Sequence, residues 1–156
     1  MNLQSTRTLN NGVEIPRLGL GVFKSQDGAE TEHAVRWALE AGYRHIDTAK
    51  AYHNEGSVGK AIAESGIDRK EIFITTKLWN DDMRTGKQRE VFEQSLEALR
   101  TDYVDLYLIH WPVKEAYVES WEIMVDLYRQ DVYKRQPGAG ARRAAVRVRV
   151  AGDAGV

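Results

Sequence analysis

Apolar residues recur at helical spacing in four segments of this chain: 29–41, 55–65, 86–100 and a segment that begins near 115. In the first segment, Ala34, Val35, Ala38 and Leu39 share one face, and Gly42 follows as a natural helix end. The corresponding sets are Val58, Ala61 and Ile62 in the second segment, Val91, Phe92, Ser95, Leu96 and Leu99 in the third, and Val118, Trp121, Val125 and Tyr128 in the fourth. The pattern therefore predicts four amphipathic helices.

Strand-like segments precede each of these helices, near 17–23, 43–48, 71–78 and 103–110. The last has an almost continuous apolar run, which predicts a strand buried on both faces. An earlier segment, 7–16, predicts a short β-hairpin, because Asn11 and Gly12 form a two-residue turn signal between extended residues.

The regular alternation of strand and helix predicts parallel strands joined by right-handed crossovers. The predicted strands start near 18, 43, 72 and 103, so each strand–helix unit occupies 25 to 31 residues. Two α/β architectures fit this repeat. One is an open doubly wound sheet, and the other is a (β/α)8 TIM barrel, of which four units would make half.

Composition narrows the class of protein. The 156 residues carry a net charge of -1, which gives no strong field for nucleic acid or an anionic membrane, so we expect neither as a partner. The absence of cysteine excludes disulfides, thiolate metal sites and a cysteine nucleophile. No apolar run reaches the roughly 20 residues of a membrane span, and the first residues lack the apolar core of a secretory signal. We therefore expect a cytoplasmic protein.

The composition changes sharply after 130. Ala, Gly, Arg and Val make up 18 of the 20 residues in 137–156, and 131–156 carries a net charge of +4, which leaves -5 on 1–130. One interpretation of 131–156 is a basic disordered tail. The other, which we favour, is an assembly artefact read from GC-rich DNA in the wrong frame, because these four residues have GC-rich codons. In both cases the predicted domain is 1–130.

Three consecutive predicted strands each end in one ionisable residue: Asp47, Lys77 and His110. In parallel α/β folds the carboxyl ends of neighbouring strands meet at one rim, where active sites form. The alternative is that the three are unrelated charges at loop edges. Tyr52 lies in the loop that covers the same rim. It could pack there as an ordinary amphipathic residue, or act as a general acid, because a neighbouring ammonium stabilises a phenolate.

Four separated segments together resemble the N-terminal half of the aldo-keto reductase family: IPRLGLGVFKS, ALEAGYRHIDTAKAYHNEGSVGKAI, EIFITTKLW and LRTDYVDLYLIHWP. The resemblance points to the branch that includes the 2,5-diketo-D-gluconic acid reductases. It implies a (β/α)8 TIM barrel, truncated here to about its first four units, with the N-terminal β-hairpin plugging the bottom of the barrel. It also implies NADPH as cofactor and a small-molecule carbonyl compound as substrate, without a metal.

The family's catalytic tetrad maps onto Asp47, Tyr52, Lys77 and His110. By this resemblance, Tyr52 donates a proton to the carbonyl oxygen while hydride passes from the nicotinamide to the carbonyl carbon. Lys77, paired with Asp47, assists the tyrosine, and His110 orients and polarises the carbonyl. The resemblance also assigns nicotinamide contacts to Gly21, Val22, Phe23 and Asp47, and substrate-pocket walls to Phe23, Trp79 and Trp111.

Other residues give weaker signals. His45 and His53 lie eight residues apart with no third ligand near them in the sequence, which argues against a metal site. The GLG run of the first strand lacks the third glycine and the helix start of a dinucleotide fingerprint. Trp79 and Trp111 could be ordinary core aromatics, but their positions just after strand ends favour pocket walls.

The second half of the family's sequence is not recognisable after 130. By resemblance, that half carries most groups that hold the cofactor and select the substrate. We therefore expect little or no activity from the 156-residue chain. We expect the parent enzyme, the complete barrel, to be a monomer. The competing hypothesis is a non-catalytic half-barrel that acts as a binding or assembly module, since open sheet edges invite self-association.

Overall fold

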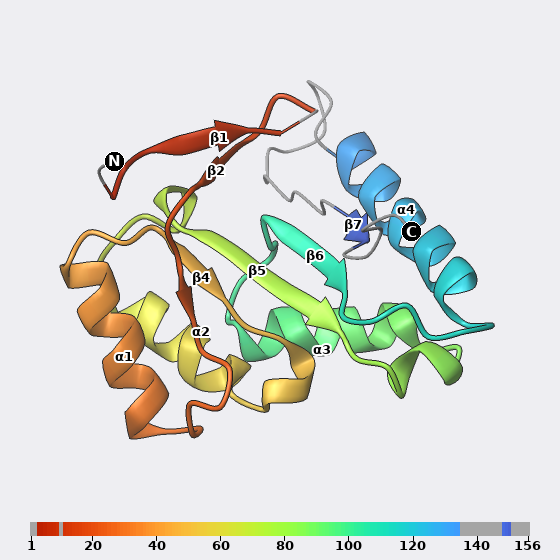
Figure 1. Ribbon diagram of the computed structural model, residues 1–156, viewed down its shortest axis with the longest axis horizontal. Coiled ribbons are helices and arrows are strands. Elements are labelled where there is room, and N and C mark those ends of the chain that lie inside the picture. Colours follow the sequence, from red (N-terminus) through yellow and green to blue (C-terminus); the bar gives the residue numbers. More distant parts are fainter. Residues whose placement is uncertain (1–2, 10, 135–147, 151–156) are drawn as a thin grey trace, which may run out of the picture.

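Strands and helices alternate along the part of the chain that the computed structural model describes, residues 3–9, 11–134 and 148–150, with side chains described as far as 130. The strands are β1 (Thr6–Thr8), β2 (Glu14–Pro16), β3 (Leu20–Gly21), β4 (His45–Asp47), β5 (Phe73–Leu78), β6 (Leu106–Ile109) and β7 (Val148–Val150). The helices are α1 (Ala29–Glu40), α2 (Glu55–Glu64), α3 (Gln88–Ala98) and α4 (Tyr117–Lys134), with short 3-10 turns η1 (Lys50–Tyr52), η2 (Arg69–Glu71) and η3 (Asp82–Arg84) (Figure 1). The four predicted helices and the predicted hairpin are thus confirmed.

The parallel sheet adds its strands in sequence order, β3-β4-β5-β6-β7. Every neighbouring pair is parallel; for example, Ile46 of β4 pairs with Ile74 of β5. A doubly wound sheet needs a point where the strand order reverses, and the described strands contain none. The winding is therefore that of part of a (β/α)8 barrel, as predicted.

Helices α1, α2 and α3 lie side by side along one face of the sheet (Figure 1), and each packs against the next. Their inward side chains include Val35 of α1, Val58 and Ile62 of α2, and Val91 of α3, all buried in one hydrophobic core. The predicted strand at 103–110 is also buried, with Tyr107 fully enclosed. Helices on a single face agree with a barrel, in which they form the outer ring.

Gly59 sets the distance between α2 and α3. A Cβ atom on this residue would lie 2.5 Å from the carbonyl carbon of Leu99 and 2.6 Å from the carbonyl oxygen of Ala98. Both are backbone atoms at the carboxyl end of α3, so they cannot move aside as a flexible side chain would. The absence of a side chain at 59 therefore allows the two helices to pack closely.

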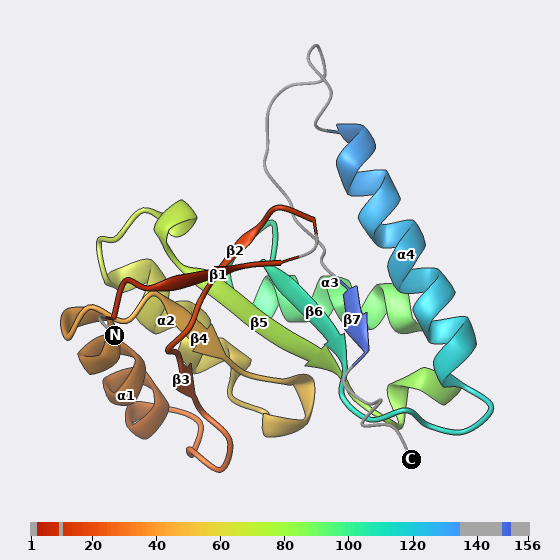
Figure 2. The same cartoon turned by 45° about the horizontal axis from the view of Figure 1, so that its top comes forward.

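The hairpin of β1 and β2 lies at the amino ends of the parallel strands, as Figure 2 shows. Residues of the hairpin and of the segments that lead into β5 and β6 together line a cleft of about 380 Å³: Thr6, Val13, Glu14, Pro16, Lys70, Glu71, Ile72, Phe73 and Asp105. This is the end opposite to the strand ends that carry Asp47 and Lys77. The position of the hairpin agrees with the predicted plug at the bottom of a barrel.

Helix α4 buries a different face from the predicted one. The predicted set included Val118 and Tyr128, whose exposed fractions are 55% and 37%, whereas Ser120, Met124 and Leu127 are buried. Apolar residues occupy more than one face of this helix, so their spacing alone does not select the buried side. Packing of α4 against α3 and β6 turns Met124 inward.

The predicted boundary at 130 falls inside α4, which continues to Lys134. The sequence pattern predicts no strand in 131–156, yet Val148–Val150 pairs with β6 at the end of the sheet. The rest of that segment lies outside the described residues, and its interpretation as a tail or an artefact stays a prediction. Within the described ranges, no helix combines the length and the apolar character needed to cross a bilayer.

Candidate active site

The carboxyl ends of β4, β5 and β6 bring three ionisable side chains to one edge of the sheet. Asp47 is the last residue of β4, Lys77 the penultimate residue of β5, and His110 follows β6 directly. The parallel register fixes their relative height, because Lys77 pairs with Leu108 while Asp47 pairs with Thr75. The burial of these strands in the core thus holds the three groups at one rim.

The ammonium of Lys77 is the centre of the cluster. Its Nζ atom donates hydrogen bonds to Oδ1 of Asp47 at 2.6 Å and to the backbone oxygen of Thr48 at 2.9 Å. The hydroxyl of Tyr52 lies 3.5 Å from the same nitrogen. The Lys77 side chain is only 13% exposed, and an ammonium has three donors. All three N–H donors of Lys77 can therefore be directed at groups of the site, which holds the ammonium in position.

Tyr52 reaches the cluster from the loop between β4 and α2. It ends the turn η1, and His53, which follows it, has a left-handed backbone with a φ of 56°. The Tyr52 ring lies 5.0 Å from the ring of Phe23 and 5.6 Å from that of His110, measured between centroids. These contacts hold the ring from two sides and leave the hydroxyl beside Lys77.

The surroundings of His110 favour the neutral form of its imidazole. Burial lowers the pKa of its ring, and the nearby Lys77 lowers it further, although Asp47 acts in the opposite direction. Its Nδ1 atom is buried and has no hydrogen-bond partner among the described residues. A neutral ring offers one N–H donor and one acceptor, so His110 can hydrogen-bond an oxygen placed beside Tyr52.

The residues predicted to meet a nicotinamide lie where β3 ends, but they differ in orientation. A side chain added at Gly21 would meet no described atom within 4 Å, so the space above this residue is open. The side chain of Val22 is turned into the core and only 2% exposed, so it can offer a bound group little besides its backbone. Phe23 is 65% exposed next to Tyr52. The open backbone and the exposed ring fit a planar group such as a nicotinamide.

The two predicted tryptophans flank His110 differently. The ring of Trp79 is partly buried and stands edge-on to His110, with a centroid distance of 5.2 Å. Trp111 is 62% exposed, so it is not a core aromatic. Both lie at the rim that carries the ionisable cluster, in positions that could border a bound substrate.

Two buried polar residues next to Tyr52 were missed by the sequence analysis. Asn54 is fully buried and hydrogen-bonds Val22 and Ser25 in the segment after β3 and Thr48 just after β4, while Glu55 is 5% exposed and accepts hydrogen bonds from Thr76 and Ser95. An Asn followed by a Glu is also common at an ordinary exposed helix start. The sequence therefore contains no signal that separates a buried pair with tertiary contacts from an exposed helix cap.

Three ionisable residues near Asp47 and Tyr52 in the sequence do not join this cluster. Nζ of Lys50 donates to Oε1 of Gln94 on α3, at 3.3 Å, and His53 is exposed. His45 lies at the start of β4, where its Nε2 is 2.9 Å from Oγ1 of Thr75. Within the described residues, no set of three or more His, Asp or Glu side chains is arranged to hold a metal ion.

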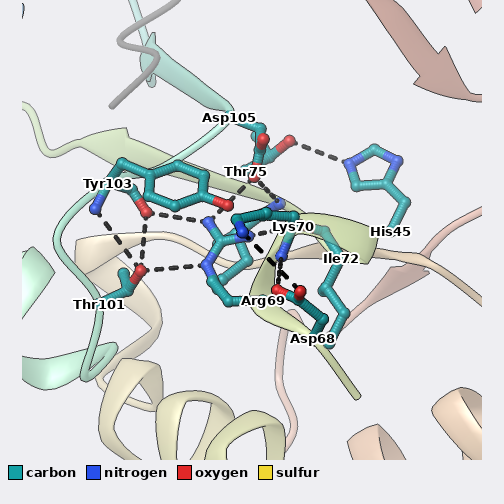
Figure 3. Close-up of polar contacts among 10 residues, drawn as sticks. His45, Asp68, Arg69, Lys70, Ile72, Thr75, Thr101, Tyr103 and Asp105 are labelled. Atoms are coloured by element: carbon teal, nitrogen blue, oxygen red, sulfur yellow. Dashed lines mark hydrogen bonds and ion pairs between the residues drawn. The ribbon is translucent and has the colours of Figure 1, made fainter. Parts of the chain in front are cut away.

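A second polar cluster, shown in Figure 3, lies at the amino ends of the strands. The Arg69 guanidinium donates to Oδ2 of Asp105 at 3.0 Å, to the backbone oxygens of Ile72 and Tyr103, and to the hydroxyl of Thr101. Asp105 also accepts the N–H of Ile74 at 2.9 Å. These bonds tie η2 to the loop before β6 and satisfy one another, so the cluster has the character of a structural clamp.

Comparison with known proteins points to one family. A family model described as "Aldo/keto reductase family" matches residues 17–130. The chain is 55% identical over 123 residues to the 9,11-endoperoxide prostaglandin H2 reductase of Trypanosoma cruzi, covering 79% of this chain and 44% of the relative. It is 50% identical over 128 residues to the glyoxal reductase of Bacillus subtilis, covering 82% and 46%. The chain thus spans less than half the length of these relatives.

Solved structures agree with this match. An aldo/keto reductase from Brucella melitensis superposes with a TM-score of 0.77 at 41% identity, over 92% of this chain and 62% of that one. An aldo-keto reductase from Bombyx mori, solved in complex with NADP, gives a TM-score of 0.72 at 36% identity, over 94% and 50%.

Proposed function

Because this chain belongs to the aldo/keto reductase family, we propose that a barrel of the relatives' length containing these residues reduces a small aldehyde or ketone to the alcohol, with NADPH as the reductant. The observation that carries the proposal is the contact of Lys77 with both Asp47 and Tyr52, at 2.6 Å and 3.5 Å. It brings a phenol, an ammonium and a carboxylate into one cluster next to His110, whose ring lies 5.6 Å from that of Tyr52. Such a set is suited to protonating an oxygen that gains negative charge.

In this proposal the bound NADPH supplies the hydride for the carbonyl carbon. The chain's own residues act on the carbonyl oxygen. Tyr52 gives its hydroxyl proton to that oxygen, so the product is a neutral alcohol and the tyrosine is left as a phenolate. The ammonium of Lys77 stabilises the phenolate, and Asp47 orients that ammonium through its hydrogen bond. His110 donates an N–H to the same oxygen, which fixes the carbonyl beside Tyr52.

The residues around the cluster supply the binding surfaces. We assign the nicotinamide to the open backbone at Gly21 and Val22, with Phe23 and Asp47 beside it. The carbonyl compound then lies against Phe23, Trp79 and Trp111. The large exposed fractions of Phe23 and Trp111, 65% and 62%, support this assignment, since exposed aromatic rings beside polar groups commonly mark binding sites.

Relatives indicate which compounds to try first. The matched proteins include a glyoxal reductase and a methylglyoxal reductase, the latter from Escherichia coli and 48% identical over 128 residues. The Bombyx mori structure was solved in complex with NADP. We therefore propose small dicarbonyl compounds as substrates and NADPH rather than NADH as the hydride donor.

A chimeric barrel tests the proposal. The aligned segment of the Bacillus subtilis glyoxal reductase is replaced by the matching residues of this chain, and NADPH oxidation with glyoxal is followed by absorbance. We expect turnover, and a loss of about 10²- to 10⁴-fold in kcat when Tyr52→Phe removes the proton donor. Tyr103→Phe is the matched control, because it removes a phenol at the Arg69 cluster, at the opposite ends of the strands. A folded, NADPH-binding chimera without turnover, or full turnover in Tyr52→Phe, would contradict the proposal.

A further inference from the structure

The side chain of Asn54 joins three segments of the chain at the rim. Its Nδ2 atom donates to the backbone oxygens of Val22 and Ser25, at 2.9 Å and 3.0 Å, and its Oδ1 accepts the hydroxyl of Thr48 at 2.9 Å. The side chain is fully buried. Because both donors face carbonyl oxygens, the orientation of the amide is fixed by its partners.

These contacts are made in place of a local one. Asn54 is the N-cap of α2, a position where asparagine usually accepts a hydrogen bond from its own helix. Here the side chain makes no such bond within α2. The local cap contact is replaced by contacts with the segments that follow β3 and β4.

Glu55 makes a second set of contacts, with β5 and with α3. Its Oε1 accepts the hydroxyl of Thr76 on β5 at 2.6 Å, and its Oε2 accepts the hydroxyl of Ser95 on α3 at 3.2 Å. Burial raises the pKa of this carboxyl, while the two hydroxyl groups act in the opposite direction. Burying a carboxyl costs free energy, so a contribution to stability alone poorly explains why Glu55 is buried.

The partners of these two residues are sequence neighbours of the site residues. Thr48 follows Asp47, and its backbone oxygen also accepts a hydrogen bond from Lys77. Thr76 precedes Lys77 in β5. Asn54 therefore fixes the Tyr52 loop to the end of β4, and Glu55 fixes it to the strand that carries the lysine.

We propose that Asn54 and Glu55 are positioning residues that hold the Tyr52 hydroxyl against Lys77. Neither touches the reacting groups. They act by anchoring the loop whose last turn carries Tyr52 to the ends of β3, β4 and β5. The effect on reduction rests on the proposed function, but the effect on the position of Tyr52 does not.

The position of Tyr52 can be measured in the full 156-residue chain by NMR. Nuclear Overhauser cross-peaks between the rings of Tyr52 and His110 report the contact at 5.6 Å. The contact of His45 with Phe73, at 5.0 Å near the amino ends of the strands, serves as an internal reference for the fold. We expect Asn54→Ala and Glu55→Ala to weaken the first set of cross-peaks by at least half and to leave the reference unchanged.

Milder variants keep the test decisive if Asn54→Ala and Glu55→Ala do not fold. Thr48→Val and Thr76→Val each remove one hydrogen bond to an anchor and keep the shape of the side chain, and we expect the same selective weakening to a smaller extent. Glu55→Gln should retain the contact, because a hydroxyl can accept as well as donate a hydrogen bond. Gln88→Ala is the matched control, since Gln88 is 1% exposed and its two hydrogen bonds tie α3 to Met83 and Ser120 instead.

The chimeric barrel adds a kinetic measurement. There we expect Asn54→Ala to lower kcat by about tenfold or more, with a smaller change in KM, because a misplaced proton donor slows the chemical step. Cross-peaks of unchanged strength in Asn54→Ala and both threonine variants would overturn the inference. An inactive unsubstituted chimera would instead contradict the proposed function, and the NMR result would still decide the positioning role.

Discussion

The Nζ atom of Lys77 lies 2.6 Å from Oδ1 of Asp47, although 30 residues separate them in the sequence. The pair is formed by neighbouring parallel strands, so it is fixed by the sheet and not by a flexible loop. Asp47 also orients the ammonium towards Tyr52, the residue to which the proposed reaction assigns the proton transfer. The contributions of this pair to activity and to stability can be measured separately.

We predict that Lys77→Met lowers kcat of the chimeric barrel by about 100-fold or more, because the phenolate of Tyr52 loses its stabilising charge. The Asp47 side chain is 36% exposed and can be hydrated once the ammonium is removed. The free energy of unfolding should therefore fall by no more than about 2 kcal/mol. Lys70→Met is the control, since its ion pair with Asp68 is long, at 4.0 Å, and exposed. Equal losses of activity in both variants would argue against a specific role for Lys77.

Gly59→Ala should destabilise the chain by about 1–3 kcal/mol, measured as the free energy of unfolding in urea. The added Cβ would lie 2.5 Å from a backbone atom of Leu99, so α2 and α3 must move apart. Gly56→Ala on the same helix meets no described atom within 4 Å and should leave the stability unchanged or raise it by up to about 1 kcal/mol. A similar effect at both positions would mean that helix propensity, and not the close approach, explains the glycine.

Arg69→Met should lower the free energy of unfolding by about 2–4 kcal/mol. The substitution leaves Asp105 without its cation and removes donors from two backbone oxygens, while the Arg69 side chain is only 20% exposed. Arg36→Met removes a long and exposed contact with Glu40, at 4.0 Å, and should change the same quantity by less than about 0.5 kcal/mol. Because Arg69 lies at the far ends of the strands, the NMR contact between Tyr52 and His110 should persist in both.

Stability should fall as the pH is lowered through about 6.5, the ordinary imidazole value. Burial lowers the pKa of His45 and of His110 in the folded chain. In this range the unfolded chain therefore binds more protons, and the unfolding equilibrium shifts towards it. The raised pKa of Glu55 has the opposite sign, and its effect begins from the ordinary carboxyl value of 4.5 upwards.

The comparison with His45→Gln isolates the contribution of His45 to this pH dependence. Midpoints of urea unfolding measured across the same pH range should change less steeply in the variant than in the parent chain. Parallel curves for the two proteins would show that His45 does not contribute.

The hydrophobic pattern was sufficient for most of the architecture. The predicted inward residues of the second helix, Val58, Ala61 and Ile62, are all buried, because a short amphipathic helix with one apolar stripe has only one face to bury. The pattern failed at α4, where Trp121, Ile123 and Met124 spread the apolar surface over several faces. There only the neighbours of the helix decide that Ser120, Met124 and Leu127 face inward.

The tertiary contacts of Asn54 and Glu55 in the candidate site could not be predicted from the sequence. Their residue types are those of a common helix start, so local propensity accounts for them without any tertiary contact. Their partners Val22, Thr76 and Ser95 lie 21 to 40 residues away. No local pattern encodes such contacts.

The amino-acid sequence alone determined that acid, base and imidazole groups stand at successive strand ends, because the alternation of strands and helices depends on neighbouring residues only. The tertiary structure decided the distances among them, and which lysine faces Asp47. Lys50 is nearer in the chain but hydrogen-bonds Gln94 on α3, whereas Lys77 is brought to the aspartate by parallel pairing of β4 and β5. The reason is physical: strand pairing and helix packing bring together residues that are remote in sequence.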